Sequence, residues 1–149
     1  GKRIAAEARG DVFTIPAEKG DVRNLTRSSD AADRTPSWSP DGRTVAYFSD
    51  ASGEYQLVLA PADGVGERRV ITLPDPSFYY TPAWSPDGSK LTYTDTHLNL
   101  WLLDVASGTA RRLDTDQYMV PERSMDPVWS PDSRYIAYVK RLPTQLRAI

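Results

Sequence analysis

The stretch Trp38-Ser39-Pro40-Asp41-Gly42 decides the fold. It recurs as Trp84-Ser85-Pro86-Asp87-Gly88 and, with serine in the glycine position, as Trp129-Ser130-Pro131-Asp132-Ser133. The three tryptophans lie 46 and 45 residues apart in a chain of 149 residues. A turn motif that returns with a period in the forties is typical of repeat architectures. The sequence therefore predicts repeated structural units. It also predicts that the residues of the repeated motif serve the fold and not a chemical function.

The three copies agree well beyond this motif. A proline precedes each tryptophan by two residues, an aliphatic residue follows it by seven, and a tyrosine follows it by nine: Pro36, Pro82 and Pro127; Val45, Leu91 and Ile136; Tyr47, Tyr93 and Tyr138. The last two positions share one face of an extended chain, because strand side chains alternate. Each unit is thus predicted to hold a strand that ends at tryptophan, a tight turn and a second strand.

The turn residues have separate roles. Proline sets φ at the first turn position, aspartate bonds to nearby backbone, and glycine tolerates a positive φ. The third copy has Ser133 where the others have glycine. We therefore expect the third turn to be strained or to be of another type.

Two further strands are predicted in each complete unit. They are residues 55–59 and 69–73 in the first, and residues 98–105 and 111–113 in the second, with turn-forming residues between them. The second strand is apolar on both faces, with Val45 and Tyr47 on one and Ala46 and Phe48 on the other. A sheet covered on both faces needs this pattern. We expect an all-β fold, a partial β-propeller of four-stranded antiparallel blades.

The repeat makes residues 1–149 a single propeller segment with two complete and two incomplete blades. The complete blades are expected at residues 28–74 and 75–116. The incomplete blade 1–27 is expected to hold the last three strands of a unit. Residues 2–6 align with residues 43–47, so the tryptophan equivalent to Trp38 would fall before residue 1. The incomplete blade 117–149 holds the Trp129 strand, a strand over 134–140 and the start of another near 146–149.

Composition limits the kinds of protein this can be. The chain is 40% hydrophobic and 26% charged, as in ordinary globular domains. Its net charge of −2 argues against nucleic-acid binding. The absence of cysteine excludes disulfides, thiol catalysis and thiolate metal sites. The sequence has no apolar run long enough to cross a membrane and no secretory signal at its start, so we expect no membrane partner.

The unit Pro-x-Trp-Ser-Pro-Asp-Gly resembles the WD40-like (PD40) propeller repeat of the TolB proteins and of several peptidases. The flanking sequence narrows the resemblance. The run 7–20 with Arg23-Asn24-Leu25-Thr26, and the segments 91–95 and 98–101, look like the N-terminal six-bladed propeller of tricorn protease homologues. This resemblance covers nearly the whole chain.

Resemblance to that family implies a cytoplasmic serine peptidase whose propellers gate or channel peptides around a distant active site. The catalytic serine and histidine of such enzymes belong to a C-terminal module, which nothing in this chain matches. The resemblance thus implies a noncatalytic segment without catalytic, metal-binding or cofactor-binding residues, and without a cofactor. Two alternatives stay open: a TolB-like propeller that binds a protein partner, and the propeller of a prolyl-oligopeptidase-type hydrolase.

Residues that suggest chemistry also have a structural interpretation. Asp41, Asp87 and Asp132 occupy equivalent turns, where aspartate bonds to local backbone, so we expect no carboxylate site. His97 is the only histidine of the sequence, and no nucleophile motif accompanies it. Because histidine catalysis needs a positioned partner, we expect His97 to be a turn residue.

The candidates for function lie at the leading end of the strand before each tryptophan. The innermost strand of a propeller blade lines the central channel, and we expect this strand to be the innermost one. The mixture of cation, aromatic and carboxylate at its start would either contact a peptide or only fill the channel mouth. The residues are Arg34, Thr35, Tyr80, Thr81, Met125 and Asp126.

Unfinished blades leave exposed strand edges, which pair readily with other chains. The opening blade lacks only its first strand, and the Trp129 strand of a second copy would supply it. Two copies joined in this way would complete six blades with twofold symmetry. We therefore expect a homodimer, in which the strand over 134–140 must find another place.

Overall fold

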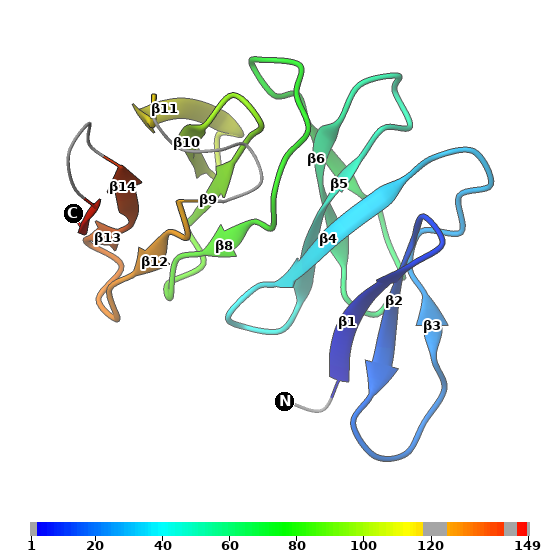
Figure 1. Ribbon diagram of the computed structural model, residues 1–149. Coiled ribbons are helices and arrows are strands. Elements are labelled where there is room, and N and C mark those ends of the chain that lie inside the picture. Colours follow the sequence, from blue (N-terminus) through cyan, green and yellow to red (C-terminus); the bar gives the residue numbers. More distant parts are fainter. Residues whose placement is uncertain (1–2, 118–124, 142–145, 149) are drawn as a thin grey trace. The chain divides into compact units, whose positions relative to one another are not determined.

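The computed structural model describes residues 3–117 and 125–141 and the backbone of residues 146–148. Every regular element within these ranges is a β-strand, which confirms the all-β class (Figure 1). No helix in the described ranges is long and apolar enough to span a membrane. The chain divides into two compact units, Gly1–Pro76 and Ser77–Ile149.

Unit 1, Gly1–Pro76, contains two antiparallel sheets whose strands follow one another in sequence order (Figure 1). The first sheet has three strands, β1 (Arg3–Ala8), β2 (Asp11–Pro16) and β3 (Arg23–Asn24). The second has four, β4 (Asp33–Trp38), β5 (Thr44–Ser49), β6 (Gln56–Pro61) and β7 (Arg69–Ile71). Four consecutive strands in meander order are the pattern expected of a propeller blade.

The core of unit 1 lies between its two sheets. Val12 and Leu25 from the first 27 residues pack against one face of the second sheet, formed by Val45, Tyr47, Val58 and Ala60. The other face of β5 is buried as well, since Ala46 and Phe48 are at most 1% exposed. The prediction that this sheet is covered on both faces is therefore confirmed.

The described residues of unit 2, Ser77–Ile149, form one four-stranded sheet and two short ones (Figure 1). The four strands are β8 (Ala83–Trp84), β9 (Lys90–Thr94), β10 (Asn99–Asp104) and β11 (Thr109–Thr115). The short sheets pair β12 (Val128–Trp129) with β13 (Ile136–Ala137), and β14 (Val139–Arg141) with β15 (Leu146–Ala148). The Tyr93 ring stacks on Trp101 at 6.2 Å and meets Tyr79 edge-on at 5.5 Å, which fills the core of this unit.

The Ser-Pro-Asp turn forms the same hydrogen-bonded lock in all three copies. Each serine hydroxyl donates to the aspartate Oδ1 at 2.6 Å and accepts a backbone N–H, at 2.9 Å, from the residue five positions after it. The serine hydroxyl is the main cause that lowers the pKa of each aspartate, to about 2 for Asp87. The local bonds expected of these aspartates are therefore present.

Ser133 adopts the conformation that glycine has in the other two turns. Its φ is 61°, against 71° for Gly42 and 72° for Gly88. The same backbone bond closes all three turns, from the N–H of the fifth motif residue to the carbonyl of the motif serine. The third turn is thus of the same type, and its predicted strain is confirmed, because a positive φ is unfavourable for serine.

The prediction of one continuous strand over residues 134–140 is wrong. It is interrupted at Tyr138, which separates β13 from β14. The cause lies in the facing segment. Val128 pairs with Ala137, and the Val139 N–H donates to the Met125 carbonyl at 2.9 Å. Asp126 and Pro127 therefore face Tyr138 alone, and this extra residue breaks the pairing.

Candidate functional site

A β-bulge marks the leading end of β4, where two of the candidate residues lie. Arg34 pairs with Phe48 and Ser37 pairs with Ala46, so Thr35 and Pro36 together face the single residue Tyr47. Such a bulge re-aims the side chains beside it, and bulges are frequent next to functional sites.

The same bulge recurs in both repeats of unit 2. The Tyr80 N–H donates to the Thr94 carbonyl and Ala83 pairs with Thr92, so Thr81 and Pro82 face Tyr93. The third copy is the Asp126-Pro127 pair described above. We call these three proline-containing pairs the leading bulges, Thr35-Pro36, Thr81-Pro82 and Asp126-Pro127. All six candidate residues lie in or directly before them, two in unit 1 and four in unit 2.

Two of the leading bulges are strained. Thr35 has φ 51° and Asp126 has φ 47°. A positive φ is a clear outlier for a β-branched residue such as threonine, and a strained residue of this kind costs about 1–3 kcal/mol. The sequence could not show this, because a residue before proline normally prefers an extended conformation.

Glu7 of β1 holds the strained bulge of unit 1. Its Oε2 accepts the Thr35 N–H at 2.8 Å, and its Oε1 lies 3.4 Å from Arg34 Nε. The side chains of Arg34 and Glu7 are 40% and 33% exposed, so this solvated ion pair is worth at most about 1 kcal/mol. Its main effect is to fix the bulge and to keep a guanidinium at its edge. Sequence reasoning missed Glu7, and no local pattern points to it.

The four candidates of unit 2 differ in how accessible they are. Thr81 and Asp126 are exposed, and Tyr80 is half-buried with Phe78 edge-on at 6.0 Å. Met125 is only 2% exposed and contributes to the interior. A ligand at these bulges would therefore meet Tyr80, Thr81 and Asp126, whereas Met125 fills space.

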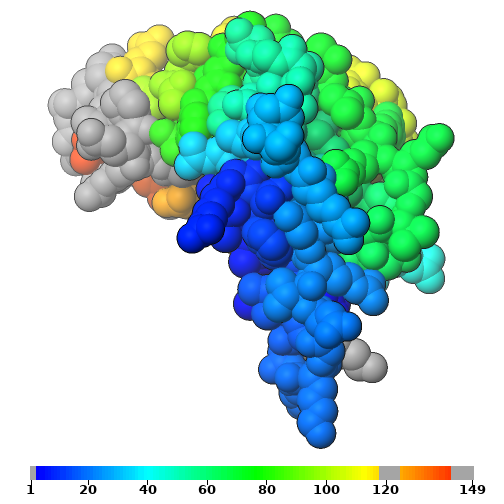
Figure 2. Space-filling model, turned by 90° about the vertical axis from the view of Figure 1, so that its right-hand side faces the viewer, coloured from blue at the N-terminus to red at the C-terminus, as the bar shows by residue number. Residues whose placement is uncertain are grey.

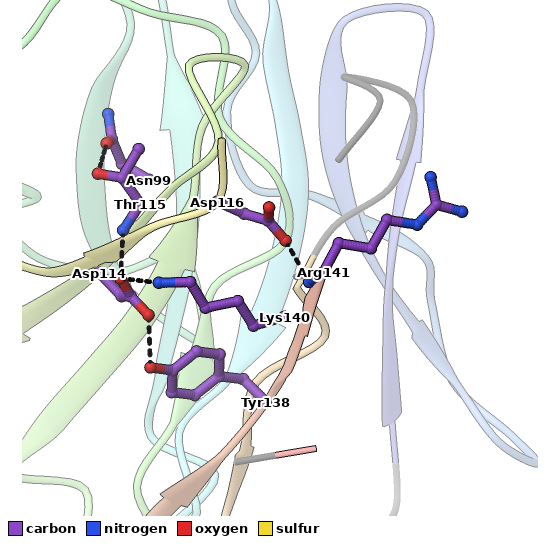
Figure 3. Close-up of polar contacts among 7 residues, drawn as sticks. All are labelled: Asn99, Asp114, Thr115, Asp116, Tyr138, Lys140 and Arg141. Carbon is purple, nitrogen blue, oxygen red and sulfur yellow. Dashed lines mark hydrogen bonds and ion pairs between the residues drawn. The ribbon is translucent and has the colours of Figure 1, made fainter. Parts of the chain in front are cut away.

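A second polar cluster, which was not predicted, joins the end of β11 and the residue after it to β14 and the residue before it (Figure 3). Asp114 accepts hydrogen bonds from the Tyr138 hydroxyl at 2.7 Å and from Lys140 Nζ at 2.6 Å. Asp116 accepts the Arg141 N–H at 2.8 Å. Because both carboxylates accept hydrogen bonds from residues of the same unit, we interpret this cluster as structural.

The pKa values in this cluster follow from its contacts. Burial would raise the pKa of Asp114, but the hydrogen bonds from Lys140 and Tyr138 outweigh it and hold that pKa below its usual value. Burial, together with the hydrogen bond to Asp114, raises the pKa of Tyr138 to about 12. The carboxylate is thus stabilised as an anion and the phenol as a neutral donor.

The remaining chemistry-bearing residues are arranged for structure. His97 is exposed in the turn between β9 and β10. The neighbouring Asp95 carboxylate accepts bonds from Asn99 and Trp101. In the described part of the chain, no group of three or more histidine, aspartate or glutamate side chains could hold a metal ion. What the geometry offers is therefore recognition through a few exposed polar groups at the leading bulges.

Meander sheets that share one bulge and one locked turn are typical of the blades of a β-propeller. The chain belongs to the family of the tricorn protease second beta propeller domain, whose model matches residues 1–149. The flanking sequence had suggested the N-terminal propeller of tricorn homologues, whereas the matching model is that of the second propeller.

Individual proteins similar to the chain share its fold. The uncharacterized protein Atu1656 of Agrobacterium fabrum is 25% identical over 144 residues, which are 91% of this chain and 48% of that protein. The structure of a putative TolB from Agrobacterium tumefaciens covers 99% of this chain and 53% of its own, with TM-score 0.72 and 24% identity. The tricorn protease structure has TM-score 0.80 and 17% identity, over 97% of this chain and 13% of its own. The chain thus spans about half the length of the curated relative it matches.

Proposed function

We propose that this chain is a noncatalytic propeller segment of a tricorn-like serine peptidase, which acts in the cytoplasm without a cofactor and guides peptides past its leading bulges. The observation that carries this proposal is the match of the whole chain to a tricorn propeller family. The bulges supply the contact point, because they hold polar groups at the start of the strands that line the channel in a propeller.

Arg34 is the residue best suited to contact a peptide. A guanidinium offers a planar set of donors that matches a carboxylate or a row of carbonyl oxygens. Its side chain is 40% exposed, and Glu7 restricts its position through the neighbouring Thr35. A segment that guides peptides must also release them. We therefore expect weak binding that depends on the free carboxylate of the peptide.

The test is a titration of the chain with a fluorescently labelled ten-residue peptide that has a free C-terminus. Arg34→Gln should weaken binding about three- to tenfold, as expected for the loss of a charge-assisted hydrogen bond. Arg43→Gln is the matched control, because Arg43 is an exposed arginine in the turn after β4. Amidation of the peptide should act like Arg34→Gln. A peptide that binds both variants equally would contradict the proposal.

A TolB-like propeller that binds a folded protein is the second candidate. The similarity to a putative TolB structure over 99% of the chain favours it. The two functions differ in their ligand. A partner that binds as a folded protein but not as its isolated peptides would favour the TolB-like function.

A further inference from the structure

Glu7 places a carboxylate on two groups of the kind that bind anions. Its Oε2 accepts the Thr35 N–H at 2.8 Å, and its Oε1 lies 3.4 Å from Arg34 Nε. A backbone N–H and a guanidinium each form charge-assisted hydrogen bonds with a carboxylate, and here they lie at the two oxygens of one group. The Thr35 N–H and the Arg34 guanidinium therefore have the arrangement of a carboxylate site, which a side chain of the chain itself fills.

The site is open to solvent. Thr35 lies in the leading bulge, outside the regular pairing of β4 with β5, and its N–H bonds to Glu7 of β1, which packs beside β4. The side chains of Glu7 and Arg34 are 33% and 40% exposed. Figure 2 shows the darkest blue atoms, those of the first described residues, at the surface of unit 1. A ligand can thus approach Glu7 and its partners from solvent.

The strained bulge itself does not require this carboxylate. In the third copy, Asp126 has φ 47°, close to the 51° of Thr35. The positions equivalent to Glu7 and Arg34 in that copy hold Thr94 and Met125. A strained bulge therefore forms in unit 2 with neither a glutamate nor an arginine at these positions. The formation of the bulge does not explain why unit 1 has both charges.

We propose that the Thr35 N–H and the Arg34 guanidinium form a binding site for the carboxylate of a ligand, and that Glu7 occupies this site until the ligand displaces it. The ligand is a peptide with a free C-terminus, so the inference rests on the proposed function and adds its regulation. An entering carboxylate makes the same two contacts that Glu7 gives up. Because only chains with Glu7 displaced can bind, the apparent affinity is lower than that of the vacant site.

Acetate tests the site without a peptide. We would follow the Thr35 amide resonance by NMR while acetate is titrated into the original chain and into Glu7→Gln, at constant ionic strength. Glutamine keeps the size of the side chain and removes its charge. The Thr35 amide of Glu7→Gln should shift saturably, at an acetate concentration about two- to fivefold lower than in the original chain, the range expected for the loss of a solvated ion pair. Adding Arg34→Gln to this variant should weaken the binding again.

Two further variants complete the design. Glu7→Ala leaves the Thr35 N–H without the side-chain acceptor and should bind acetate at least as tightly as Glu7→Gln. Urea unfolding would verify that both Glu7 variants are folded. Glu67→Gln is the matched control, because Glu67 is an exposed glutamate in the loop between β6 and β7. It makes the same change in net charge and should bind acetate as the original chain does.

The labelled ten-residue peptide provides the second measurement. Glu7→Gln should bind it about two- to fivefold more tightly than the original chain, and Glu67→Gln should bind it equally. If Glu7 only supports the bulge, Glu7→Gln will bind the peptide more weakly. That result would overturn the proposal, and so would acetate that fails to shift the Thr35 amide of Glu7→Gln or that binds Glu67→Gln as tightly. Acetate that binds Glu7→Gln at Thr35, while the peptide binds no form of the chain, would support the carboxylate site and contradict the proposed function.

Discussion

Ser133 allows a direct measurement of the strain in the repeated turn. It has φ 61°, and its hydroxyl accepts a hydrogen bond from the backbone N–H of Asp87, in the turn of the preceding copy. Two opposing effects therefore meet at one residue. The conformation favours glycine, and the hydrogen bond requires serine. We compare Ser133→Gly with Ser133→Ala, because both remove the hydroxyl and only glycine relieves the strain.

The magnitudes predict an order of stability. Losing the hydrogen bond lowers the free energy of unfolding by about 0.5–1.5 kcal/mol in both variants. Glycine regains about 1 kcal/mol because it adopts a positive φ without strain. The greater conformational entropy of glycine in the unfolded chain offsets part of this gain. Ser133→Gly should thus lie within about 0.5–1 kcal/mol of the original chain, and Ser133→Ala should be the least stable of the three.

Gly42→Ala calibrates the conformational cost without the hydrogen bond. Gly42 has φ 71°, and a Cβ added there would meet no atom within 4 Å. Its loss of about 1 kcal/mol is therefore conformational alone. Urea unfolding followed by tryptophan fluorescence measures all three variants. If Ser133→Ala is more stable than Ser133→Gly, the turn is not strained, since glycine would then only loosen the unfolded chain.

Three further predictions concern the core, the polar cluster and one cross-sheet contact. Leu57→Ala should lower the free energy of unfolding by about 2–5 kcal/mol in urea titrations, because Leu57 is fully buried. The pKa of the Asp114 carboxyl is lower in the folded chain than in the unfolded chain. The carboxylate therefore stabilises the fold fully at pH values above its pKa in the unfolded chain, and this stabilisation is lost as the pH falls through its pKa in the folded chain. The stability difference between the original chain and Asp114→Asn should therefore shrink below about pH 4, as measured by urea titrations between pH 7 and pH 2. Arg68→Lys should lower stability by about 0.5–1.5 kcal/mol and speed amide exchange in the residues directly after β3, because the guanidinium donates to the Leu25 and Thr26 carbonyls.

The sequence predicted those parts of the fold that depend on local patterns. The locked turns, the four-stranded sheets and the burial of both faces of β5 all follow from turn chemistry and from alternation along one strand. The interruption at Tyr138 could not be predicted in this way. It depends on the register between two segments, and its cause lies ten or more residues earlier, at Asp126-Pro127.

The sequence predicted where the candidate residues lie in the repeat, and their role as a site stays a prediction. The repeat places Arg34 and its equivalents just before each conserved proline, and the bulges lie there. The sequence gives no sign of the positive φ at Thr35, because a residue before proline normally prefers an extended conformation. Glu7 and Asp114 were missed for another reason. Each makes its contacts with a different sheet, and only the tertiary arrangement brings those partners together.

The repeated motif makes two kinds of contact, one within a turn and one between neighbouring sheets. Its Ser-Pro-Asp part closes a turn within one sheet, and the bonds are the same in all three copies. In unit 2 its tryptophan reaches the sheet before, as Trp129 does through Ala83. This bond couples the sheet β12-β13 to the sheet before it, as is typical of neighbouring units in repeat proteins. Trp38 carries the same motif, but its buried Nε1 has no acceptor among the described residues.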